Sequence, residues 1–171
     1  NLYQEPELIE HIMKVWRDDG VPKNIPLLDT ETNDHGGEAA VDIFGALWLA
    51  DSFAGFLTAG GASTHYYHDL SYSPPHPACA NSWGTYHMFM VDEKYQIKTP
   101  TSQYFAARLL TQEWAQPVDA QHRLFTAASD VKDSEGHVLV TAYPLQRPDG
   151  QWSLMLINKD HEHAHRVHIS F

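Results

Sequence analysis

Apolar positions in the first two thirds of the chain follow helical and extended spacings in turn. This pattern predicts helices at 7–18, 38–61 and 101–114, strands at 24–31 and 62–69, and a long loop at 70–89. Strands that alternate with helices are typical of βα units built on a parallel sheet. The first two thirds of the chain are therefore expected to belong to the α/β class.

The ends of these helices carry residues that start and stop helices. Pro6 lies near the first turn of the first helix, and Gly20 follows its end. Gly60 closes the long alanine-rich helix. Thr99 and Pro100 predict the N-cap and the first helical position of the third helix.

The last third of the chain has a different pattern, in which extended segments are separated by turn signals. Strands are predicted at 123–131, 137–145, 152–160 and 165–171. These segments predict an antiparallel unit that forms part of a β-sandwich. The predicted domains are residues 1–116 and residues 117–171.

These predicted elements do not close a core by themselves. Two βα units and part of a sandwich leave strand edges open. The chain also begins in the lead-in to a helix and stops in a predicted strand. We therefore expect a fragment of a longer protein, or one chain of a split protein.

The charge balance limits the classes of partner. The 171 residues include 22 acidic and 11 basic side chains, which give a net charge of −11. No lysine or arginine cluster offsets this negative field, so we expect no nucleic-acid partner. No run of about 18 apolar residues is present, so we expect no membrane partner. We favour a secreted or periplasmic location.

A carboxylate is placed where one predicted strand ends. Side chains alternate along a strand, so Leu27, Asp29 and Glu31 are expected on one face. Active sites in barrels and open α/β sheets lie at the carboxyl ends of the strands. Glu31 is therefore a candidate for catalysis, with Asn33 within reach, while Asp29 is expected to be a structural acid bonded to its neighbours.

The second predicted strand brings further polar and aromatic groups to the same level. His65, Tyr66 and Tyr67 lie near its end. A carboxylate surrounded by polar donors and aromatic faces is the inventory of a sugar-binding site. We expect these groups to converge with Glu31 and Asn33 on one mouth.

The order of these segments resembles a known enzyme class. Residues 25–33, the long helix, 61–70, 83–110 and the trailing β unit are similar to the C-terminal half of clan A glycoside hydrolases, especially family 39 and the heparanase-like families. The resemblance implies the last strands and helices of a (β/α)8 TIM barrel with an appended antiparallel β-sandwich. It also implies a retaining mechanism in which Glu31 is the nucleophile.

The resemblance implies that the second catalytic residue, the acid/base, lies outside this chain. The acid/base glutamate of the clan follows an asparagine on an earlier strand that is not in this sequence. The implied partners are a carbohydrate substrate and the remaining N-terminal half of the barrel, in the same parent chain or in a second chain. No cofactor is implied. Many clan members stack a tryptophan under the sugar; here Tyr66, Tyr67 or the loop residue Trp83 would take that role.

Alternative interpretations remain open. His161, His163, His165 and His168 have a spacing that could bind a metal, although a solvated turn is the simpler reading. The single cysteine, Cys79, allows no internal disulfide and lacks the context of a nucleophile. A carbohydrate-binding protein without catalysis on the same scaffold is the principal alternative to an enzyme.

Overall fold

The computed structural model describes residues 2, 5–33, 42–66, 71–72, 88–116 and 119–170. The first described elements alternate between helix and strand: α1 (Glu5–Asp18), β1 (Leu28–Thr32), α2 (Ile43–Thr58) and β2 (Ser63–Tyr66). Strands β1 and β2 pair in parallel, and α2 is the helix that connects them. The predicted parallel βα arrangement is thus confirmed for this pair of strands.

Helix α2 is the central element of the molecule. The Asp42 carboxylate caps its start by accepting a hydrogen bond from the Phe44 backbone N–H at 2.8 Å. Gly60 follows its end with a φ of +100°, which only glycine adopts easily, and so confirms the predicted stop. Because α2 is apolar on most sides, it is buried by the elements that surround it.

A small sheet precedes the third helix, and the sequence pattern did not predict it. It contains β3 (Ser71–Tyr72), β4 (Phe89–Val91) and β5 (Ile97–Pro100). The predicted N-cap at Thr99 was wrong, because Thr99 and Pro100 pair with Met90 and Phe89 in this sheet. The N-cap is Thr101 instead, and helix α3 (Ser102–Arg108) follows it and continues as the π-helix η4 (Leu109–Ala115).

The last third of the chain forms an antiparallel sheet, as predicted. Its strands are β6 (Arg123–Leu124), β7 (Val140–Gln146) and β8 (Trp152–Asn158), in the order β6-β7-β8. The strand predicted at 123–131 is limited to two residues of the sheet. The strand predicted at 165–171 was wrong for the described residues 165–170, because they find no strand to pair with.

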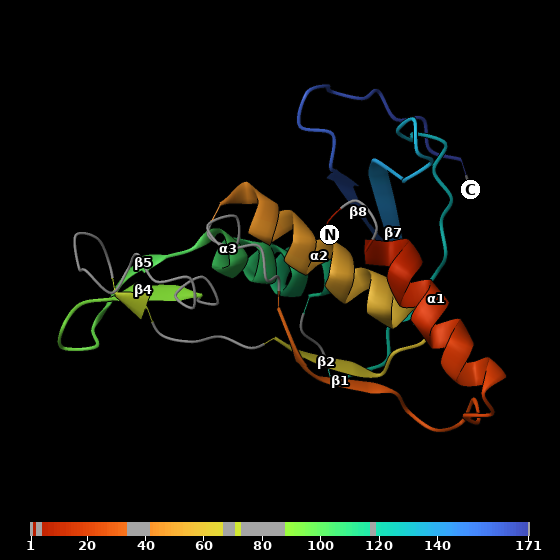
Figure 1. Cartoon of the computed structure of the whole chain (residues 1–171), viewed down its shortest axis with the longest axis horizontal. Coiled ribbons are helices and arrows are strands. Elements are labelled where there is room, and N and C mark those ends of the chain that lie inside the picture. The colour runs from red at the N-terminus through yellow and green to blue at the C-terminus, as the bar shows by residue number, and fades with distance from the viewer. Residues whose placement is uncertain are drawn as a thin grey trace.

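The layers meet at α2. Figure 1 shows β1 and β2 on one side of α2, the sheet with β7 and β8 on the other, and α3 running beside it. One hydrophobic cluster joins these layers and includes Trp48, Leu49, Trp114, Leu145 and Ile157. It contains residues from both predicted domains. In the described part of the chain none of the three sheets is closed, and the barrel and the sandwich stay predictions.

A buried charged group fastens the β7–β8 sheet to α2. Asp51 on α2 and Lys159 just after β8 are both fully buried, with 3.0 Å between the Lys159 Nζ and the Asp51 Oδ2. The other carboxylate oxygen accepts hydrogen bonds from the Thr141 and Tyr143 hydroxyls, each at 2.6 Å. Burial and the Asp51 carboxylate raise the pKa of Tyr143, so its hydroxyl keeps its proton and remains a donor.

Removing the ammonium group from this network should destabilise the fold. In Lys159→Met the Asp51 charge stays buried without its counter-charge, and we expect the free energy of unfolding to fall by about 3–5 kcal/mol. Urea unfolding followed by tryptophan fluorescence measures the change. The matched control is Lys14→Met, which removes an exposed ion pair with Asp18 on α1 and should cost less than about 1 kcal/mol. Equal, small effects for both variants would contradict a stabilising role for Lys159.

Candidate active site

The parallel pairing of β1 and β2 brings two predicted site residues to the same end of one sheet. Asp29 lies opposite Thr64, and Thr32 lies opposite Tyr66. Glu31 and His65 lie between these two pairs and therefore at the same level, near the carboxyl ends of the two strands, and both are exposed. This end of a parallel sheet is where α/β proteins place their active sites.

An irregularity in β1 decides how Glu31 is presented. The three steps from Asp29 to Thr32 lie against only two steps from Thr64 to Tyr66, so β1 carries one extra residue, a β-bulge. The predicted alternation consequently holds for Leu27 and Asp29, which are half-buried, but it was wrong for Glu31, which is exposed. Bulges re-aim side chains and occur frequently next to active sites.

Asp29 has the structural role that the sequence predicted. Its carboxylate accepts a hydrogen bond from the Thr64 hydroxyl on β2 at 3.5 Å and from the Glu31 backbone N–H at 3.3 Å. Asp29 thus links the two strands and supports the bulge directly under Glu31. Its oxygens are occupied by these neighbours, whereas the Glu31 side chain faces solvent.

Asn33 is tied to the third helix by a reciprocal pair of amide hydrogen bonds. The side-chain amide of Gln103 on α3 donates to the Asn33 Oδ1 at 2.9 Å, and Asn33 donates back to the Gln103 Oε1 at 3.5 Å. Gln103 is fully buried. The pair fixes the chain just after Glu31, and the partner on α3 was missed by sequence reasoning because 70 residues separate the two amides.

Tyr66 faces α2, and its hydroxyl is held there. The hydroxyl lies 2.8 Å from the Ser52 Oγ and donates to the Leu49 carbonyl at 3.2 Å. Its ring meets the Trp48 ring edge-to-face, with 5.9 Å between the centroids. Of the predicted sugar-facing residues on β2, His65 is therefore the exposed one, and Tyr66 positions the strand on α2.

Three residues considered in the sequence analysis cannot be compared with the structure. Tyr67, Trp83 and Cys79 lie outside the described residues. The structure thus brings Glu31, Asn33, His65 and Tyr66 to one end of the β1–β2 pair, in two groups. Glu31 and His65 point to solvent, while Asn33 and Tyr66 bond to the helices behind the sheet.

The histidine-rich segment forms a turn around one carboxylate. Asp160 accepts hydrogen bonds from the backbone N–H groups of Glu162 and His163 at 3.0 and 3.1 Å, and it lies 2.7 Å from the His165 Nε2. Among the described residues, which include all four histidines of the predicted cluster, no group of three histidine, cysteine or acidic side chains is arranged to hold a metal ion. The segment is a turn, as the simpler reading predicted, although no strand follows it in the described residues.

Comparison with known proteins found no match to this chain among family models, curated proteins or solved structures. The resemblance to glycoside hydrolases therefore stays a prediction. Within the described part of the chain, none of the helices combines the length and apolar character needed to cross a membrane.

A pair of variants on β2 separates the positioning residue from the exposed one. Tyr66→Phe removes the hydroxyl that bonds to Ser52 and Leu49, and we expect the free energy of unfolding to fall by about 1 kcal/mol. His65→Ala removes an exposed side chain and should change it by less than about 0.5 kcal/mol. Urea unfolding of both variants checks this. A larger loss in His65→Ala than in Tyr66→Phe would show that the two roles are reversed.

The Asp160 turn should open in acid before the sheet does. The backbone N–H of Glu162 and then the His165 ring hold the pKa of Asp160 at about 2. A carboxyl whose pKa is lowered by folding stabilises the turn above its unfolded pKa of about 3.9 and loses this contribution as the pH falls towards the folded value. After correction for the intrinsic pH dependence of exchange, hydrogen exchange at the Glu162 and His163 amides should accelerate between about pH 4 and pH 2. The Ile157 amide on β8 is the reference, and its protection should not fall in the same interval. Unchanged protection in this interval, or in Asp160→Ala at neutral pH, would contradict the assignment.

Proposed function

We propose that this chain carries the nucleophile of a retaining glycoside hydrolase, and that Glu31 is this nucleophile. The observation that supports the proposal is the exposed Glu31 carboxylate at the carboxyl end of a parallel strand, on a bulge supported by Asp29 and at the level of His65 on β2. A nucleophile has to be fixed in position and accessible to the substrate. The Glu31 backbone is held by Asp29, and the Glu31 side chain is exposed, which supports this role.

The proposed chemistry proceeds in two displacements. The Glu31 carboxylate attacks the anomeric carbon, the glycosidic oxygen leaves with a proton from a second carboxylic acid, and a glycosyl ester forms on Glu31. Water then attacks the same carbon, gives its proton to the second carboxylate and releases Glu31. This mechanism requires the two carboxyl groups to lie about 5–5.5 Å apart. Asp29 is bonded to Thr64 and to the Glu31 backbone, so we assign the acid/base to the remaining half of the barrel.

An uncovered apolar surface supports the existence of that second half. Helix α1 buries Met13, but a second stripe along the helix is exposed. The stripe has helical spacing and consists of Leu8, Ile12, Val15 and Trp16. A parallel sheet is normally covered on both faces, whereas α2 covers β1 and β2 on one side (Figure 1). Further βα units against this stripe and the β1 edge would cover both surfaces.

Mechanism-based labelling tests the nucleophile directly. The native protein is treated with a panel of 2-deoxy-2-fluoro glycosides that carry a good leaving group, and its peptides are then mapped by mass spectrometry. We expect one fluoroglycosyl adduct on Glu31. These reagents depend little on the acid, and the glycosyl ester that they form with the nucleophile accumulates. The sugar of the productive reagent identifies the substrate class.

Matched variants distinguish attack at Glu31 from reaction at any exposed carboxylate. Glu31→Gln should abolish labelling, while Glu93→Gln, which removes an exposed glutamate next to β4, should leave it unchanged. In Glu31→Ala, added azide should restore turnover of an activated glycoside and give the azide of inverted configuration. Labelling that persists in Glu31→Gln would overturn the assignment. Sugar binding without any labelling would favour the carbohydrate-binding protein instead.

A further inference from the structure

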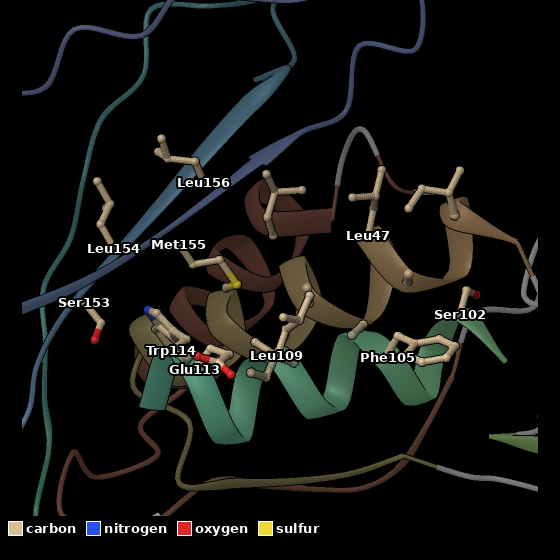
Figure 2. A pocket seen from close by; sticks show the side chains of 16 residues that line it. Leu47, Ser102, Phe105, Leu109, Glu113, Trp114, Ser153, Leu154, Met155 and Leu156 are labelled. Carbon is tan, nitrogen blue, oxygen red and sulfur yellow. The ribbon is translucent and has the colours of Figure 1, made fainter. Parts of the chain in front are cut away.

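An apolar groove lies on the opposite side of α2 from Glu31. It has a volume of about 730 Å³ and is bounded by α2, by α3 with η4, and by β8. Figure 2 shows Phe105, Leu109, Glu113 and Trp114 on its helical wall and Leu154, Met155 and Leu156 on β8. Several of its large apolar side chains are uncovered: Leu109 is 57% exposed and Phe105 is 47% exposed.

The β8 side of the groove is a strand edge. Five consecutive residues of β8, 153–157, line the groove, although consecutive side chains of a strand point to opposite faces. Strand β8 is also the last strand in the order β6-β7-β8 among the described residues. The groove therefore follows the backbone edge of β8, where both faces of the strand contribute.

The register shows which backbone groups this edge presents. Lys159 N–H donates to the Leu139 carbonyl, and Arg147 N–H donates to the Gln151 carbonyl, at the two ends of the β7–β8 ladder. Hydrogen-bonded and non-bonded pairs alternate in an antiparallel ladder, so Met155 bonds to β7 and its neighbours do not. The N–H and C=O groups of Leu154 and Leu156 accordingly point away from β7, towards the groove.

Among the described residues, the β8 edge lacks the features that prevent other strands from pairing with it. Natural edge strands are protected by lysine, proline, bulges or covering elements. Residues 152–158 contain no lysine, arginine or proline, and their pairing with β7 is regular over seven residues. The one proline of the sheet, Pro144, lies on the central strand β7. An unprotected apolar edge of this kind indicates a surface that is covered when the protein functions.

We propose that this groove binds an extended peptide segment of a partner protein, which adds to β8 as a further strand and places alternate apolar side chains against α2 and α3. Main-chain hydrogen bonds to Leu154 and Leu156 would give affinity, and the apolar wall would select side chains. Glu113 is the one charged residue among the 16 that line the groove. The segment therefore carries one cationic residue that faces Glu113.

Charge argues against a second copy of this chain as the occupant. Each copy carries a net charge of −11, and pairing β8 with β8 would bring two such negative molecules together. Like charges oppose such an interface. A neutral or cationic strand from another protein meets no such repulsion.

Hydrogen exchange on the intact chain tests the proposal. The probe is an acetylated and amidated peptide of about seven residues, in which valine and threonine alternate around one central lysine, at up to about 1 mM. We expect slower exchange at the Leu154 and Leu156 amides in its presence, and no change at Met155, whose amide is already bonded to β7. No added protection at the highest peptide concentration would overturn the proposal.

Modified peptides provide controls that leave the protein unchanged. Methylating the backbone nitrogens along one edge of the peptide should abolish binding, and methylating those of the other edge should not, because only one edge pairs with β8. Equal binding of both peptides would show that the groove holds apolar side chains without strand addition. A dimer that protects Leu154 and Leu156 in the absence of peptide would assign the surface to a second copy and also overturn the proposal.

Two protein variants test the backbone and the charge. Leu156→Pro removes an N–H that points into the groove and spares the ladder to β7, so peptide affinity should fall at least about tenfold; circular dichroism and urea unfolding establish that the variant is folded. Glu113→Lys should weaken the lysine peptide and strengthen its glutamate counterpart. If Leu156→Pro does not fold, the methylated peptides and Glu113→Lys still decide the question. If Glu113→Lys binds both peptides with unchanged affinity, the charged residue of the peptide does not face position 113, and the proposed orientation of the segment is wrong.

Discussion

The buried contact between Asp51 and Lys159 is the interaction on which the arrangement of the molecule depends. One carboxylate on α2 bonds to Thr141 and Tyr143 on β7 and to the ammonium group that follows β8. A half-satisfied buried network is worse than an apolar core, so the sheet can occupy only the register that supplies all three donors. Strand β2 is fixed on α2 by Tyr66, and the two sheets are thereby oriented relative to each other.

Elements governed by local residues could be predicted from the sequence, and those governed by distant partners could not. Pro6, Gly20 and Gly60 mark the start of α1 and the ends of α1 and α2, and these boundaries lie close to where they were predicted. The start of α2 was predicted wrongly, because Asp42 is its extended N-cap and the helix begins at Ile43 rather than at residue 38. Thr99 and Pro100 carry an equally good helix signal, but pairing with β4 overrides it. The extended pattern at 165–170 failed for the opposite reason, because a strand needs a neighbour and no described strand pairs with it.

The candidate site likewise contains some features that could be predicted from the sequence and others that depend on distant partners. The positions of Glu31 and His65 follow from the alternation of strands and helices, because parallel strands bring their carboxyl ends together. The bulge that exposes Glu31 leaves no mark in the apolar pattern, since it arises from the pairing of β1 with β2. The partners of Asn33 and Tyr66 are equally invisible, because Gln103 and Ser52 look like ordinary helix residues until the helices pack.

Helix α2 also explains why the described part of the chain presents two separate open strand edges. A helix that is apolar on most sides serves a sheet on each side, and each of these sheets ends in an open edge among the described residues. The β1 edge belongs to a parallel pair, so the further βα units that we propose would extend this sheet. The β8 edge belongs to an antiparallel sheet beside a helical wall, so it fits a single extended strand. Strands β1 and β8 lie on opposite sides of α2 (Figure 1), and occupation of one strand edge therefore leaves the other free.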